Sequence, residues 1–147
     1  MRDYQYRQDL FEVLTSADTA LIYLAGAKEF LDKADDWSKI DMFGGTIITS
    51  AIKHKQIKEA QSNMDKAEKA IELFKKELQD ILVIKDFDLE LTADIVITDI
   101  IFDNVFTDSI VQNQIDHAQF QVNYAIDQIR KIRETVLEYD RQHHGEL

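Results

Sequence analysis

The chain has 147 residues, 45% of them hydrophobic and 31% charged, which suits one globular domain and is too apolar for a disordered chain. It has no proline and only four glycines, too few turn residues for an all-β or α/β fold, and no cysteine, which excludes disulfides and thiolate metal sites. The net charge is −11 and only Lys53, Lys55 and Lys58 come near a basic patch, so we expect no nucleic-acid partner, and an acidic chain is repelled by anionic lipid.

The first predicted helix spans residues 4–34. Its apolar side chains recur at spacings of three and four, as on one face of an α-helix. They are Leu10, Leu14, Ala17, Leu21, Leu24 and Leu31. Asp32, Asp35 and Asp36 follow, and negative charge is unfavourable at a helix C-terminus. We therefore end this helix near residue 34 and interpret residues 36–45 as a connector.

The second predicted helix spans residues 46–82, with Thr46 as its N-cap. Apolar residues continue along it at alternating spacings of three and four for more than three heptads, the pattern of coiled coils and long bundles. They are Ile57, Ala60, Met64, Ala67, Ile71, Phe74, Leu78 and Ile81. The pattern predicts one long helix that packs against others.

The last third, residues 92–141, contains neither proline nor glycine. Either one kinked helix spans it, or Asn104 or Thr107 caps a new helix, and we favour a break within residues 104–108. A third stripe then follows at the same spacing. It consists of Ile115, Ala118, Val122, Ala125, Ile129, Ile132, Val136 and Tyr139.

The second and third stripes are related in sequence. Shifting residues 48–71 onto 106–129 aligns both stripes in register and matches residues such as Ile57 with Ile115 and Ala60 with Ala118. Chance similarity between heptads is the alternative explanation. We therefore predict a single all-α domain, residues 1–147, as an antiparallel bundle of three to four long helices. Residues 46–82 and 104–141 are candidate repeats of one helical hairpin with approximate two-fold symmetry.

Two short patterns carry a resemblance to a known family. The first comprises Trp37, Asp41, Gly44–Gly45, Lys53–His54, Ile57 and Ala60–Gln61, and the second comprises Phe102–Asp103 and residues 108–115. They resemble the motifs of a family of uncharacterised helical bacterial proteins. The resemblance implies a helical domain and supplies no activity, substrate or cofactor. It suggests that the two connector regions, rather than the stripes, are distinctive.

A polar cluster is the first candidate site. Asp99 and Asp103 lie four residues apart on one helical face, and Lys53 and His54 come from the equivalent end of the other repeat. Together with Asp108 they predict a charge-paired layer that fixes helix register. The alternative is a metal site made of Asp99, Asp103 and His54, with His117 as a further candidate ligand. The Glu-x-x-His motif of di-iron bundles is absent, so we expect no cofactor.

Trp37, Met42 and Phe43 are the second candidate site, either a plug over the bundle end or a partner surface. There is no cysteine nucleophile, Gly-x-Ser-x-Gly motif or dinucleotide fingerprint. We therefore predict a non-catalytic module that self-associates or binds another protein, a basic one being suited to the acidic surface. A metal-binding or enzymatic bundle is the alternative.

The location is expected to be the cytoplasm. The N-terminal segment MRDYQYRQDLFEVL is charged throughout, unlike a signal peptide, and the lack of cysteine suits a reducing compartment. We expect no membrane-spanning helix, because no stretch of about eighteen uncharged apolar residues occurs.

Overall fold

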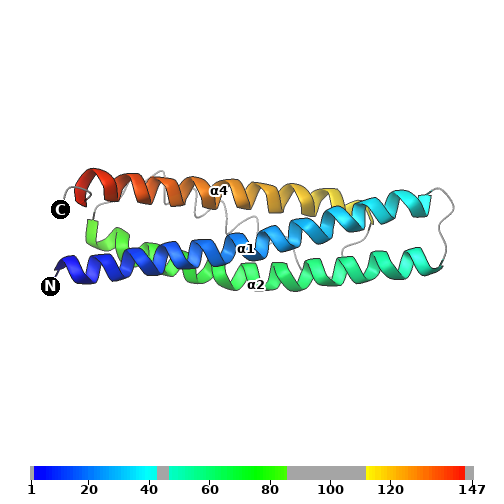
Figure 1. Ribbon diagram of the computed structural model, residues 1–147, viewed down its shortest axis with the longest axis horizontal. Coiled ribbons are helices and arrows are strands. Elements are labelled where there is room, and N and C mark those ends of the chain that lie inside the picture. Colours follow the sequence, from blue (N-terminus) through cyan, green and yellow to red (C-terminus); the bar gives the residue numbers. More distant parts are fainter. Residues whose placement is uncertain (1, 43–46, 86–111, 145–147) are drawn as a thin grey trace.

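The computed structural model describes residues 2–42, 47–85 and 112–144 (Figure 1). These residues form three long helices, α1 (Arg2–Met42), α2 (Ile47–Lys85) and α4 (Gln112–His144). Within the described ranges the chain is entirely α-helical, which confirms the all-α prediction. The three helices lie lengthwise beside one another, and the start of α1 lies at the same end as the end of α4.

Helices α1 and α2 form an antiparallel pair. The position of Gly26 on α1 faces Asn63 on α2, the Lys66 Nζ lies 5.8 Å from the centroid of the Tyr23 ring, and the carboxyls of Glu12 and Glu77 lie close together. In each of these pairs, the two residues are equally distant in sequence from the Gly44–Gly45 dipeptide. The two helices therefore keep one register from end to end.

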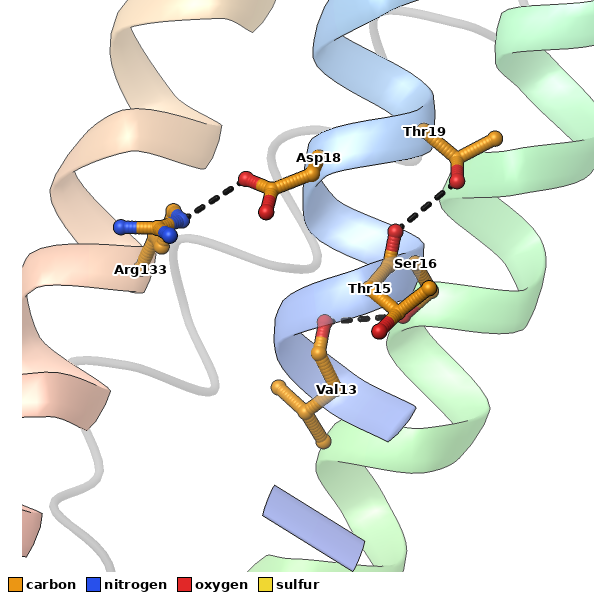
Figure 2. Close-up of polar contacts among 6 residues, drawn as sticks. All are labelled: Val13, Thr15, Ser16, Asp18, Thr19 and Arg133. Atoms are coloured by element: carbon orange, nitrogen blue, oxygen red, sulfur yellow. Dashed lines mark hydrogen bonds and ion pairs between the residues drawn. The ribbon is translucent and has the colours of Figure 1, made fainter. Parts of the chain in front are cut away.

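Helix α4 packs on another side of α1, also antiparallel to it. Three polar contacts join them in order: the Tyr6 hydroxyl donates to Asp140 at 3.2 Å, Arg133 Nε donates to Asp18 at 2.8 Å, and Gln119 Nε2 donates to Asp32 at 2.9 Å. Figure 2 shows α1 between the other two helices, with Arg133 reaching across from α4. Because α2 and α4 both run opposite to α1, they are parallel to each other.

The core follows the predicted stripes of α2 and α4. All eight apolar residues of the α2 stripe are buried, as are seven of the eight in the α4 stripe, Tyr139 being partly exposed. Positions matched by the proposed repeat, such as Ile57 with Ile115, are buried on both helices. The duplication and its symmetry stay predictions, and residues 86–111, including the favoured helix break, lie outside the described residues.

The predicted stripe of α1 was right for Ala17, Leu24 and Leu31, which are buried, and wrong for its other leucines, which lie at the edge of the core face. The buried row is Val13, Ala17, Ala20, Leu24, Ala27, Leu31 and Ala34, each with no exposed surface. Leu10, Leu14 and Leu21 lie beside this row and are only partly buried. Because α1 contacts two helices, its apolar arc is wide, and its small residues occupy the centre where the helices approach most closely.

The predicted end of α1 was also wrong, since the helix continues to Met42. Asp32 and Asp35 do not lie at a helix end but within it, where they pair with Lys28 and Lys39 at 3.3 Å across one turn. Residues 36–42 are therefore helical rather than part of a connector. Trp37 lies on this helix and is partly buried.

Helix α1 passes a simple test for a membrane span. Between Tyr4 and Ile40 it contains an 18-residue window with mean hydropathy 1.3 and no more than two charged residues, a third of it buried. The sequence expectation missed this window because it required a stretch without charges. Core helices of soluble bundles pass the same test, so the window is weak evidence for a membrane.

Gly26 marks a close approach between α1 and α2. A Cβ at this position would lie 2.6 Å from Asn63 Oδ1, closer than real contacts allow. Asn63 is held in place because its Nδ2 donates to the Glu59 carbonyl at 2.9 Å. Any larger residue at position 26 therefore has to displace the Asn63 side chain.

We expect Gly26→Ala to change the free energy of unfolding by less than about 0.5 kcal/mol. A gain of about 1 kcal/mol in helix propensity is offset by displacing Asn63 and losing its hydrogen bond. In an Asn63→Ala background the same substitution should stabilise by about 1 kcal/mol. Urea unfolding of the two single variants and the double variant measures this coupling, and additivity within about 0.3 kcal/mol would contradict the close contact.

Candidate functional site

The predicted polar layer is only partly within the described residues. Lys53 is partly buried and His54 is exposed, at successive positions on α2. Asp99, Asp103 and Asp108 lie outside the described residues, so their convergence with Lys53 and His54 stays a prediction. His117, the fourth group of the alternative metal site, is exposed on α4 with its ring Nε2 3.0 Å from Gln121 Nε2. Across the three described helices, no group of three or more histidines or carboxylates could hold a metal ion.

The predicted partner surface lies at the end of the α1–α2 pair. Trp37 is partly buried, Met42 is the last residue of α1, and Phe43 lies outside the described residues. Exposed apolar side chains do occur beside them, since Ile40, Ile47 and Ile48 are 48%, 89% and 71% exposed. These isoleucines were not among the residues predicted for the partner surface, which were Trp37, Met42 and Phe43.

A groove runs between α1 and α2, and both helices contribute to its walls. It has a volume of about 230 Å³. Its lining consists of Phe11, Glu12, Thr15, Ser16 and Thr19 from α1 and Ala70, Leu73 and Glu77 from α2. Phe11 is 69% exposed and Leu73 is 49% exposed, so each helix contributes one large apolar side chain that water reaches.

Two of the hydroxyl groups that line the groove, those of Ser16 and Thr19, hydrogen bond within α1 itself. Ser16 Oγ donates to the Val13 carbonyl and Thr19 Oγ1 donates to the Thr15 carbonyl, both at 2.9 Å (Figure 2). Such bonds back to the preceding turn use the hydroxyl proton within the helix. The apolar character of the groove therefore comes from Phe11, Leu73 and Ala70, while its charged groups are the carboxyls of Glu12 and Glu77.

Two glutamates meet across this groove. The carboxyls of Glu12 of α1 and Glu77 of α2 lie close enough to hydrogen bond when one of them is protonated, and Glu12 also accepts from Gln8 Nε2 at 3.4 Å. Burial, the hydrogen bond to Glu12 and the charges of Glu12 and Asp80 raise the pKa of the Glu77 carboxyl, against the opposing effect of Lys76. Among the described residues, neither carboxylate forms an ion pair with a lysine or arginine. The pair therefore holds uncompensated negative charge.

We expect Glu77→Gln to remove a pH dependence from the stability of the protein. Because folding raises the pKa of Glu77, the stabilisation from its protonated form is complete below the unfolded pKa of about 4.5 and is lost as pH rises through the folded pKa. Relative to the wild type, the variant should therefore gain stability as pH rises above about 4.5. Urea unfolding of both proteins at several pH values measures the difference, and an unchanged difference across that range would contradict the coupling.

No protein-family model matches the chain. No curated protein and no solved structure matches it either. The resemblance of residues 37–61 and 99–115 to a family of uncharacterised helical proteins therefore stays a prediction, and function has to be argued from the residues of the groove.

Proposed function

We propose that the protein is a non-catalytic interaction module, a helical bundle that binds another protein through the groove between α1 and α2. The observation that carries this proposal is the pair Phe11 and Leu73, large apolar side chains that are more than half and about half exposed on opposite walls of one groove. Isolated exposed apolar residues are common, but apolar side chains gathered around a concavity are typical of binding sites.

The partner is another protein rather than a second copy of this chain. Each copy carries a formal charge of −11, so the approach of two copies is opposed by repulsion. The carboxyl pair at one end of the groove adds negative charge at the contact itself. Both features favour a partner with a basic surface, because complementary charge speeds association and excludes wrong partners.

A matched pair of double variants tests this proposal. Phe11→Ser/Leu73→Ser removes both apolar walls, whereas Ile22→Ser/Phe120→Ser removes exposed apolar side chains outside the groove, which are 68% and 66% exposed. Because all four residues are exposed, we expect little change in stability from either double variant.

The full-length chain and both variants are immobilised and exposed to extract from the source cells, and bound proteins are quantified. We expect a protein that is retained by the wild type and the control but at least tenfold depleted on the groove variant. If no such protein is found, or if both variants lose it equally, the groove is not the binding surface. Light scattering provides a further test. If the wild type is a dimer and only the groove variant is a monomer, the groove binds a second copy of this chain and not another protein.

A further inference from the structure

The size of the groove restricts what enters it. At about 230 Å³ it is smaller than the roughly 300–1,000 Å³ typical of small-molecule sites. It is also too small to hold a secondary-structure element. It therefore suits one long side chain projecting from the surface of a partner.

The chemistry of the walls selects the kind of side chain. Phe11 and Leu73 offer apolar surface, while Glu12 and Glu77 place two carboxyls, one from each helix, at the same groove. Arginine and lysine combine an apolar stem with a cationic end, and both bury the stem against apolar surface. Arginine suits this groove better, because its planar fork binds two acceptors at once and its weak hydration lowers the cost of partial burial.

We propose that the groove binds an arginine side chain of a basic partner protein, with the methylene stem against Phe11 and Leu73 and the guanidinium against the carboxyls of Glu12 and Glu77. This inference rests on the proposed function and specifies its partner. The aromatic ring of Phe11 adds a further attraction, since guanidinium groups stack on aromatic faces. Asp80, which acts on Glu77 with the same sign, strengthens the negative field, and Lys76 weakens it without forming an ion pair.

Other occupants leave the carboxyl pair uncompensated. A neutral apolar side chain would fill the groove but would further desolvate two acidic groups that repel each other. An acidic segment would add a third negative charge. Only a cation turns the repulsion between Glu12 and Glu77 into attraction, and this charge complementarity decides the choice.

Three capped tripeptides probe the groove in the full-length protein: acetyl-Leu-Arg-Leu-amide and its counterparts with lysine or citrulline in the centre. Citrulline keeps the shape of arginine and removes its charge. Titrations are followed by the backbone amide NMR shifts of residues 11–19 and 70–77. We expect the arginine peptide to bind at least tenfold more tightly than the citrulline peptide and more tightly than the lysine peptide, with the difference from citrulline shrinking as salt rises.

Two double variants make the test specific. Glu12→Gln/Glu77→Gln removes the carboxylates and keeps the shape, and it should weaken the arginine peptide at least tenfold while leaving the citrulline peptide unchanged. Glu29→Gln/Glu59→Gln makes the same change of charge on the same two helices away from the groove and should leave both unchanged. Circular dichroism and thermal unfolding check that both variants fold. We expect Glu12→Gln/Glu77→Gln to fold because it removes a repulsion between two carboxylates.

Equal binding of the arginine and citrulline peptides, no binding at millimolar concentration, or an equal loss in both variants would overturn the arginine assignment. The proposed function fails separately. If a partner protein depends on Phe11 and Leu73 but the arginine peptide does not bind, the interaction module stands and arginine is excluded. If the peptide binds at the groove but no partner depends on it, the arginine pocket stands and the proposed function is wrong.

Discussion

Replacing Phe74 by alanine is expected to lower the free energy of unfolding by about 3–5 kcal/mol. Phe74 is 2% exposed and is the largest of the fully buried side chains. The symmetry of the α1–α2 pair about Gly44–Gly45 places it level with Thr15, between the buried residues Val13 and Ala17. The side chains that face Phe74 from α1 are small or medium-sized. They cannot reach across to fill the cavity that alanine would leave.

Leu73→Ala is the matched control for this prediction. Leu73 is the neighbouring residue on α2 but is 49% exposed, so its truncation should cost less than about 1.5 kcal/mol. Urea unfolding of the two variants measures both losses, with an unchanged slope indicating that the unfolded state is the same. A loss for Phe74→Ala no larger than for Leu73→Ala would mean that Phe74 does not anchor the core. Since small domains have total stabilities of about 5–15 kcal/mol, the expected loss is large enough to unfold part of the population.

The stripes of α2 and α4 could be predicted from the sequence because each helix turns one narrow face to the core. Alternating spacings of three and four then identify that face directly, as they do from Ile57 to Ile81. Helix α1 lies between two partners, so apolar residues occur over a wider arc and periodicity alone does not identify its centre. The predicted stripe included the large residues Leu10, Leu14 and Leu21, which lie at the edge of the core face. Alanines occupy the centre of that face, where α1 contacts the other helices.

The end of α1 could not be predicted because acidic residues act differently inside a helix and at its end. Asp32 and Asp35 would be unfavourable at the last turn, but within the helix each has a lysine one turn away, Lys28 and Lys39. Asp32 also accepts from Gln119 of α4, a contact that depends on tertiary packing and has no signature in the local sequence.

The groove depends on interhelical register, which periodicity does not supply. Glu12 and Glu77 are far apart in the sequence, and no motif joins them. One available signal could have paired them: an antiparallel hairpin centred on Gly44–Gly45 brings together residues equally distant from that dipeptide, and Glu12 and Glu77 are such a pair. Gly44–Gly45 was interpreted as part of a connector and of the resemblance, and the helix register that it implies was not predicted.

The same register identifies Ala27 as a position where added volume should be costly, and we expect Ala27→Leu to destabilise by about 1–3 kcal/mol. Ala27 has no exposed surface and lies level with Ala60 and Met64, which are also fully buried. The neighbouring Gly26 already approaches Asn63 so closely that a Cβ would collide with it. Three additional carbon atoms at position 27 therefore have to push the two helices apart or displace Met64.

Ala25→Leu adds the same volume to the same turn of α1 but at an exposed position, and it should change stability by less than about 0.5 kcal/mol. Equal effects of the two substitutions in urea unfolding would show that the helices are not in close contact at Ala27. Adding a substitution at Met64 tests whether overpacking is the cause of the destabilisation by Ala27→Leu. Met64→Ala alone should cost about 2–5 kcal/mol, because it leaves a cavity. In combination with Ala27→Leu it should cost at least about 1 kcal/mol less than the sum of the single changes, since the new leucine occupies the space that Met64 vacates.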